Sequence, residues 1–445
     1  MRESGNNLGE KPKRNGNGAT AATITRAIAT TGEVFADGST IELIGGAHDG
    51  NPVLMVWDGS KETVGARVEH HGQLYEPAPI NSSILQELIL PTRCCPHGNT
   101  RELLAEICKL VANLVGLDEK PASLVGRIVL CSALVDAVPV APMLTIVGPD
   151  TARGNRLMAL LRCLCRHSLL LTGVTPAGFC SLSSGARFTY LISQSTVSGK
   201  LQKLLDDTSR RDQKIPYRGG LLDLFGAQVI HAESIPFSEP LSLRSMQIPM
   251  IPGGAQLPTF DLDVQHRVTG DFQAKLLSFR RVNLSAACKL QFDSSKFTFP
   301  MRELAHCIAA ATPDDAELQA EVFDLFRDRD EEIHAGTWIE LSAVAVESIL
   351  MACRESPGGV IYVGGLAEIA QEILSRRGGD SSIDPGAFGR RLNILGFRTE
   401  PRDAKGMKIR LTEDVCRRAR QLACDLGVHQ VGDPAPPAPA ATGPE

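Results

Sequence analysis

Residue types suited to holding a phosphate group follow an apolar run near the middle of the chain. The segment Leu144–Val147 is apolar and of strand length, and Gly148 and Pro149 follow it as turn residues. Leucines then recur at spacings of three and four up to Leu164, which predicts a helix. A strand, a glycine-bearing loop and a helix start place backbone N–H groups where they can bind phosphate. This stretch is therefore the candidate nucleotide site.

The phosphate-binding signature is incomplete. A P-loop needs G-x-x-x-x-G-K-[ST], whereas the fifth residue after Gly148 is Arg153, followed by Gly154 and Asn155. The loop therefore has no lysine for the β- and γ-phosphates and no hydroxyl for magnesium. We expect a P-loop type fold whose nucleotide site has eroded, with no cofactor.

Length and composition restrict the classes of protein to consider. A chain of 445 residues is too long for one compact core, and 43% hydrophobic with 22% charged residues is ordinary for a soluble protein. No apolar run reaches the roughly 20 residues of a membrane span, and the polar start lacks a signal peptide. Twelve cysteines without a secretory signal indicate reduced thiols. We expect a cytoplasmic protein with no membrane partner.

Strand and helix patterns alternate after the candidate site, which favours an α/β fold with a parallel sheet covered on both faces. The predicted strands are Leu144–Val147, Ser168–Thr172, Phe188–Ile192, Gln228–Ala232 and Met246–Ile251.

Shifts in composition and periodicity divide the chain into segments. Before the sheet, the Asp-Gly pairs at 37–38, 49–50 and 58–59 suit hairpin turns, and Asn99 with Glu102 forms a capping-box pattern. Thr312 followed by Pro313 indicates a helix start. We predict a disordered arm (1–28), a small antiparallel β-module (29–80), a helical connector (81–140), a degenerate P-loop NTPase-like core (141–260), a helical subdomain (261–336), a winged-helix domain (337–428) and a disordered tail (429–445).

With these elements placed, the chain resembles a family of bacterial proteins. They are the P-loop ATPase-like proteins of mobile elements that accompany primases and replicative helicases, in the form whose P-loop is degenerate. The resemblance covers most of the chain from Glu33 to Val428. It is carried by LTIVGPDTARGN, RHSLLLTGVTPAGF, RFTYLIS and LSLRSMQIPM.

The resemblance also shows what has been lost. In active members the third strand ends in an Asp-Glu pair that binds magnesium and activates water, and here Ser193 and Gln194 stand in those places. An Asp-Arg-Ser run before the last strand keeps its arginine as Arg244 but has Leu243 in place of the acid. The resemblance implies a vestigial nucleotide site made of Gly148, Gly154, Asn155 and Arg244.

Phosphoryl transfer depends on charge neutralisation and positioning by the lysine, the magnesium ligands and the water-orienting acid. Because all three are missing, we expect a pseudo-ATPase with no catalytic residues.

Metal-ligand residue types occur in two clusters, Cys94-Cys95-Pro96-His97 and Cys163-x-Cys165-x-His167. Structural zinc sites use paired C-x₂₋₄-C spacing with a second pair at a distance, and neither cluster offers it. His231-Ala232-Glu233 matches half of a zinc deaminase signature, but no P-C-x-x-C run follows. We expect buried free cysteines and no metal site.

The last 100 residues predict three helices followed by a β-hairpin, which is the order of a winged helix. Between Arg376 and Arg420 there are twelve Lys/Arg and six Asp/Glu, a basic excess of six in an acidic chain. On a winged helix the third helix enters the major groove and the wing lies near phosphates. The predicted contacts with double-stranded DNA are Arg390, Arg391, Arg398, Arg402, Lys405 and Lys408.

These inferences favour a non-catalytic, DNA-associated protein with a pseudo-ATPase core, linked to replication of mobile elements. A homo-oligomer or a replication-protein partner fits the same interpretation. Two alternatives stay open: a DNA-dependent ATPase or helicase accessory with an atypical nucleotide loop, and an oligomeric scaffold that binds only protein.

Overall fold

The computed structural model describes most of the chain between the two predicted disordered ends. The predicted tail lies outside the described residues, as does the predicted arm except for its last two residues. None of the described helices combines the length and apolarity needed to cross a membrane. The described residues are 27–46, 51–182, 185–234, 240–252, 257–339, 341–377, 382–404, 406–426 and 428.

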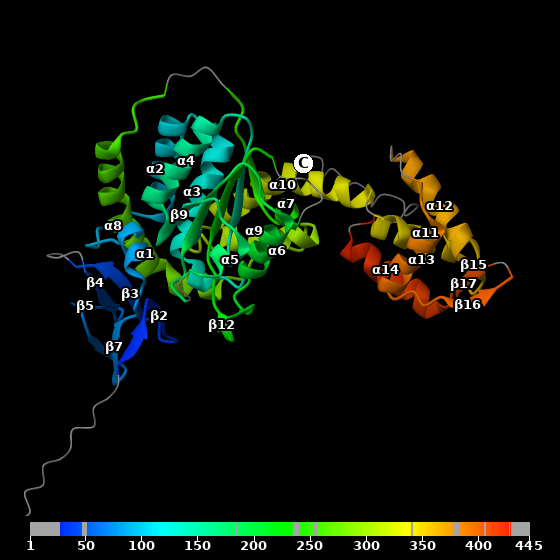
Figure 1. Cartoon of the computed structure of the whole chain (residues 1–445), viewed down its shortest axis with the longest axis horizontal. Coiled ribbons are helices and arrows are strands. Elements are labelled where there is room, and N and C mark those ends of the chain that lie inside the picture. Colours follow the sequence, from blue (N-terminus) through cyan, green and yellow to red (C-terminus); the bar gives the residue numbers. More distant parts are fainter. Residues whose placement is uncertain are drawn as a thin grey trace, which may run out of the picture.

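Residues 28–77 form short strands in two small sheets (Figure 1). One sheet is antiparallel in the order β2-β3-β4-β5, and the other has the order β1-β7-β6. The expectation of a purely antiparallel arrangement is wrong for one pair, because β1 runs parallel to β7. A parallel pair needs a long crossover, which the strands between them provide. The strands are β1 (Ile28–Thr30), β2 (Gly32–Val34), β3 (Thr40–Gly45), β4 (Pro52–Trp57), β5 (Glu62–Gly65), β6 (Val68–His70) and β7 (Gln73–Pro77).

Two of the predicted Asp-Gly turns lie between paired strands. Asp37-Gly38 connects β2 to β3 and Asp58-Gly59 connects β4 to β5, with both glycines at positive φ. The third pair, Asp49-Gly50, lies outside the described residues. The small core beneath these strands consists of Ile41, Leu43, Leu54, Val56, Val68 and Tyr75.

Three helices, α1 (Ser82–Glu87), α2 (Thr100–Val115) and α3 (Glu119–Ala133), lead to the central sheet. The predicted capping box of α2 is confirmed: the side chain of Asn99 accepts from the Glu102 backbone N–H, and the Glu102 carboxylate accepts from the Asn99 N–H.

The central sheet is five-stranded and entirely parallel, which confirms the predicted α/β class. Its strands agree with the predicted ones to within two residues at each end. Their order is β14-β8-β13-β10-β9, so β8 lies between β13 and β14 while the chain leaves β8 for β9 at the far edge. Ligands of open α/β sheets bind at such a reversal of strand order, beyond the carboxyl ends of the strands. The strands are β8 (Met143–Val147), β9 (Ser168–Thr172), β10 (Thr189–Ser193), β13 (Gln228–Ala232) and β14 (Met246–Pro249).

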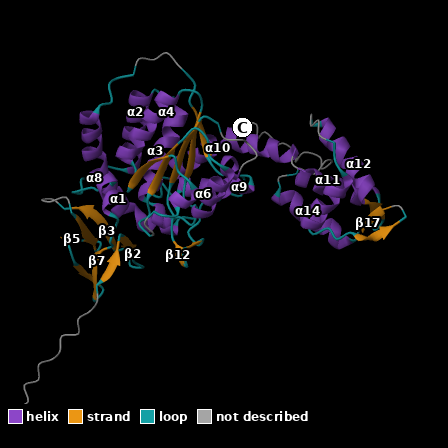
Figure 2. Ribbon diagram, viewed as in Figure 1, coloured by secondary structure: helices purple, strands orange, loops and turns teal. Residues whose placement is uncertain are grey.

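Helices cover both faces of this sheet (Figure 2). Side chains of α2, α3 and α4 (Thr151–Leu164) share one hydrophobic core with Leu144, Leu191 and Val229. The opposite face, with Tyr190 and Ile230, packs against α5 (Pro176–Phe179), α6 (Gly199–Thr208) and α7 (Pro240–Leu243). A hairpin absent from our predictions, β11 (Ile215–Tyr217) and β12 (Gly220–Leu222), precedes β13.

The helices α8 (Leu262–Lys289), α9 (Phe299–Ala309) and α10 (Ala316–Ile339) contribute to the same core as α2, α3 and α4. The predicted helix start at Thr312-Pro313 is wrong by three residues. The carboxylate of Asp315 accepts from the Leu318 N–H, so Asp315 satisfies the N-terminal donors of α10.

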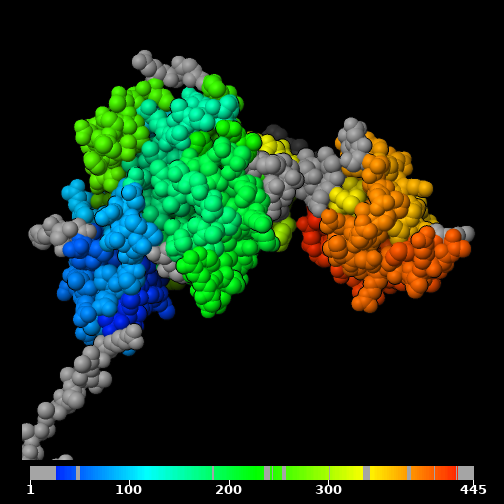
Figure 3. All heavy atoms as spheres, viewed as in Figure 1, coloured from blue at the N-terminus to red at the C-terminus, as the bar shows by residue number. Residues whose placement is uncertain are grey.

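The C-terminal elements form a lobe with its own hydrophobic core (Figure 3). Helix α13 is capped at Asp384 with Pro385 behind it, as predicted, since Asp384 accepts from the Ala387 N–H. Three strands form an antiparallel sheet in the order β15-β17-β16. In chain order the elements are α11 (Leu341–Glu355), β15 (Val360–Tyr362), α12 (Val363–Arg376), α13 (Pro385–Ile394), β16 (Glu400–Asp403), β17 (Gly406–Arg410) and α14 (Glu413–Asp425).

A buried network of charges joins the N-terminal strands to the central core. Glu42 on β3 accepts from Arg166 Nε (2.6 Å) and from Arg280 Nε on α8 (2.7 Å), and Arg280 also pairs with Asp136 (2.6 Å). Burial opposes ionisation of Glu42, but Arg166 and Arg280 hold the pKa of its carboxyl below the ordinary value. The network therefore depends on an ionised Glu42.

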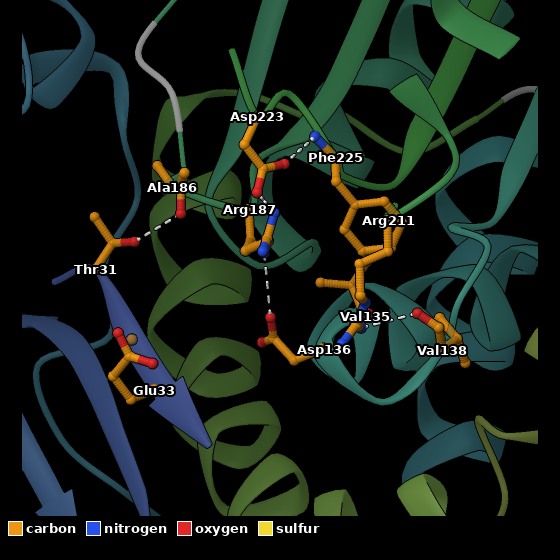
Figure 4. A network of polar contacts seen from close by, with 12 residues as sticks. Thr31, Glu33, Val135, Asp136, Val138, Ala186, Arg187, Arg211, Asp223 and Phe225 are labelled. Carbon is orange, nitrogen blue, oxygen red and sulfur yellow. Dashed lines mark hydrogen bonds and ion pairs between the residues drawn. The ribbon is translucent and has the colours of Figure 1, made fainter. Parts of the chain in front are cut away.

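The same network continues toward the sheet (Figure 4). Arg187 lies between Asp136 and Asp223, with its Nη1 2.7 Å from an Asp223 oxygen. Arg211 donates to the carbonyl oxygens of Val135 and Val138, both at 2.8 Å. These contacts join the segment around Asp136 to a residue just before β10 and to the segment that follows α6.

Candidate nucleotide site and candidate nucleic-acid interface

The loop after β8 is held tightly against the segment that follows β14. Gly148 has φ +140°, and a Cβ there would overlap the backbone of Met250. The Met250 N–H donates to Val147 O (2.6 Å), and the Asp150 N–H donates to Met250 O (3.2 Å). Only glycine permits this approach, which holds the backbone of residue 250 against the loop.

Three backbone donors at the start of α4, those of Thr151, Arg153 and Gly154, have partners within the loop. The Arg153 N–H donates to the Asp150 carboxylate (3.0 Å), and the Gly154 N–H donates to Asp150 O (3.0 Å). The Thr151 N–H donates to Pro149 O (3.0 Å). A helix N-terminus favours a negative charge, and here the Asp150 carboxylate supplies it. The helix start therefore has its own internal anion.

A histidine ring fills the next part of the site. His231, at the end of β13, lies against Gly154 so closely that a Cβ on Gly154 would overlap the ring. Ser193 Oγ donates to Asn155 Oδ1 (3.2 Å) and lies 3.1 Å from His231 Nδ1. Burial lowers the pKa of His231, which favours the neutral ring. Asn155, Ser193 and His231 thus satisfy one another across the carboxyl ends of β10 and β13.

The contact between Ser193 and His231 was missed by the sequence analysis, although a signal for it existed. The two residues are direct partners in the parallel ladder of β10 and β13. Polar residues at the carboxyl ends of neighbouring parallel strands meet at one edge of the sheet, so the polar strand ends are the signal for such a contact once the strands are known to be neighbours. The strand order needed to recognise it is not written in either strand.

Arg244 lies in a different environment from the other three predicted nucleotide-site residues. Its guanidinium pairs with Asp206 of α6 (2.8 Å) and with Glu303 of α9, which also binds Arg210. Among the described residues, no ion pair or hydrogen bond joins Arg244 to Gly148, Gly154 or Asn155. Arg244 therefore links α6, on one face of the sheet, to α9, which belongs to the core of the other face.

The predicted cations of the C-terminal lobe fall into two groups. No ion pair within the described part of the chain involves Arg390, Arg391, Arg398 or Arg402, and of these only Arg391 is half-buried. Lys408 differs, because it pairs with Asp403 (3.2 Å) and Glu400 (3.9 Å) on the same sheet. Lys405 lies outside the described residues.

Helix α13 presents its arginines away from the core of the lobe. Phe388 and Leu392 are fully buried against the neighbouring helices, whereas Arg390 is exposed. One face of the helix is thus committed to packing and another is cationic and accessible.

The two cysteine clusters do not assemble a metal site. In the described chain, the group of His, Cys, Asp or Glu ligand atoms close enough to hold an ion contains neither cluster. His97 Nδ1 contacts Ser278 Oγ (3.2 Å), and Cys163 donates to Ala159 O (3.3 Å). All twelve cysteines are free thiols.

The fold is that of an α/β protein with a parallel five-stranded sheet, in which the loop after β8 contacts Met250 and the start of α4 contacts His231. No family model matches the chain, and no curated protein sequence matches it. Among solved structures, the apo C-terminal region of NrS-1 is similar over 83% of this chain and 96% of that chain, with 12% identity and a TM-score of 0.35.

Two further solved structures are similar to this chain. A full-length MCM homologue from Methanopyrus kandleri matches over 65% of this chain and 76% of its own, with 11% identity and a TM-score of 0.34. Cdc6p from Pyrobaculum aerophilum matches over 66% and 92%, with 11% identity and a TM-score of 0.16. With similarities this remote, functional interpretation depends on the geometry of the chain itself.

Proposed function

We propose that this chain is a non-catalytic, DNA-associated protein in which the closed core is a scaffold and the C-terminal lobe binds duplex DNA. The observation that carries the proposal is the cationic side of α13, where Arg390 is exposed opposite the buried Phe388 and Leu392 and the neighbouring Arg391 is half-buried. Arginines with no ion-pair partner among the described residues are available to phosphates at no loss of an ion pair that the structure describes.

The order of elements in the lobe supports this proposal. A helix, a strand, two helices and a two-stranded hairpin follow one another from α11 to β17, which is the order of a winged helix. In helix-turn-helix proteins the corresponding second helix of the pair lies in the major groove with its N-terminal residues at the base edges. Helix α13 takes that place here, and Arg402 lies on the first strand of the hairpin.

The core supports a scaffold role because its phosphate loop is closed in two ways. Asp150 provides the anion at the start of α4, and His231 covers Gly154. A nucleoside triphosphate would have to displace Met250 and the Asp150 carboxylate from the loop. The loop has no lysine that could then pair with the phosphates.

We predict that ATP·Mg²⁺ does not bind the full chain in the micromolar range. Isothermal titration calorimetry checks this prediction. A saturable isotherm with Kd below roughly 100 μM, about -5.5 kcal/mol, would show that the loop opens and would overturn the pseudo-ATPase part of the proposal.

Binding to DNA is tested separately, with the full chain and a fluorescently labelled duplex in anisotropy titrations at several salt concentrations. Each phosphate neutralised contributes about -0.9 to the slope of log K against log salt. A steep negative slope is expected. Absence of binding at low salt would favour the protein-binding scaffold instead. A homo-oligomer, a replication-protein partner and a role in mobile-element replication stay predictions from the resemblance.

A further inference from the structure

Three side chains of metal-ligand type meet at one end of the N-terminal strands. Asp37 lies in the turn between β2 and β3, and His70 and His71 lie at the turn between β6 and β7. One ligand atom of each residue lies within 4.8 Å of the other two. Asp37 Oδ2 and His71 Nε2 are 3.1 Å apart, close to the separation of two ligands on one tetrahedral ion. Two turns that are distant in the sequence thus present three donors to one point.

Ser39 orients two of these side chains. Its N–H (2.9 Å) and its hydroxyl (2.6 Å) both donate to Asp37 Oδ1, which leaves Oδ2 on the side of His71. The single proton of the hydroxyl is used for Asp37, so the Nε2–H of His70 donates to Ser39 Oγ (2.7 Å). The lone pair of His70 is then on Nδ1.

We propose that Asp37, His70 and His71 bind one divalent transition-metal ion of the zinc class. Imidazole and carboxylate ligands suit Zn²⁺, and three protein ligands leave a fourth tetrahedral position for water. The ion joins a turn of the β2-β3-β4-β5 sheet to a turn of the β1-β7-β6 sheet. These sheets share a small hydrophobic core, and small cores are commonly reinforced by a structural metal.

The conformation of His71 provides a variant that removes a ligand without disturbing the turn. His71 has φ +49° and Gly72 has φ +70°, which are the left-handed positions of a two-residue hairpin turn. Asparagine is the favoured residue at the first of these positions. The substitution His71→Asn is therefore expected to fold at least as well as the native chain while losing the imidazole.

The test uses the full chain after removal of metals with a chelator. Titration with Co²⁺ followed by visible absorption, and with Zn²⁺ followed by calorimetry, is expected to show one equivalent bound. His71→Asn and Asp37→Asn should each weaken binding at least tenfold. His266→Asn, which changes an exposed histidine on α8, should leave it unchanged.

Two results would overturn the proposal. One is the absence of saturable Co²⁺ or Zn²⁺ binding, or binding of equal strength in the His71→Asn variant. The other is an intense near-ultraviolet thiolate band with Co²⁺, which would place the ion on cysteines such as Cys94 and Cys95. An unfolding midpoint of His71→Asn equal to or above that of the native chain confirms that the variant is folded.

Discussion

The contact between the His231 ring and Gly154 can be tested by adding one methyl group at position 154. Because a Cβ at Gly154 would overlap the His231 ring, Gly154→Ala should destabilise the protein by about 1–3 kcal/mol through overpacking. Truncating the ring with His231→Ala makes room for the methyl group. We therefore expect Gly154→Ala to lower the free energy of unfolding much less in the His231→Ala background than in the native chain. Shifts of the urea unfolding midpoint measure both effects.

Gly270 provides the matched control for this cycle. It lies in the interior of α8, and a Cβ there would have nothing within 4 Å. Gly270→Ala should stabilise the helix by up to about 1 kcal/mol. If Gly154→Ala had the same stabilising effect, or cost as much with and without His231, the ring would not be what closes the site.

At the scale of residues, the sequence predicts the loop residues that lie next to a strand and a helix. It does not predict contacts between residues that only the strand order brings together. Gly148 and Gly154 are recognisable as loop residues because strand, turn and helix signals are contiguous around them. His231 lies far along the chain, and its contact with Gly154 follows only when β13 is placed beside β8. Asp37 and His70 meet for the same kind of reason, through the arrangement of two hairpin turns.

At the scale of elements, helix α13 can be separated from the general positive charge of its lobe. Arg390→Ala with Arg391→Ala removes two cations from the proposed DNA-binding helix. Arg376→Ala with Arg417→Ala removes the same charge from two exposed arginines paired with Glu372 and Asp414. Arg418 is unsuitable as a control, because its Nε donates to Leu395 O at the end of α13.

If α13 contacts phosphates, the first double variant should reduce the magnitude of the salt slope by about 1.8, which is two phosphate contacts. The second should leave the slope nearly unchanged. Anisotropy titrations of the two full-length variants with one duplex measure both values. Equal losses would mean that the lobe binds DNA through its overall charge, and the assignment of α13 as the DNA-binding helix would be wrong.

The start of a helix can be predicted from the sequence where its capping residue lies next to the donors that it satisfies. Asn99 with Glu102, and Asp384 with Pro385, mark helix starts because the capping groups lie within three residues of the donors they satisfy. Thr312-Pro313 predicts the start of α10 three residues too early. Asp315 follows it and is the residue whose carboxylate accepts from the Leu318 N–H, so Asp315 caps the helix. The parallel pairing of β1 with β7 has no local signal, since only the assembled strands bring these two together.

At the scale of the whole molecule, the N-terminal strands are held to the core by charge as well as by apolar packing. Glu42 is the acceptor that Arg166 and Arg280 share, and all three side chains are almost completely buried. Each arginine comes from a different part of the core, one after α4 and one on α8. Removing the carboxylate therefore leaves two buried cations short of a partner.

Glu42→Gln should accordingly cost about 3–5 kcal/mol, as expected when one member of a buried ion pair is removed. Glu62→Gln is the matched control, since Glu62 pairs with Arg281 (3.0 Å) nearer the surface and should cost at most about 1 kcal/mol. Both variants are made with Trp338→Phe, so that fluorescence reports on Trp57 of β4 while circular dichroism reports on the helices. If the network joins the strands to the core, Glu42→Gln lowers the urea midpoint of both signals together. A shift of both signals no larger than that of Glu62→Gln would mean that apolar packing alone holds the two parts together.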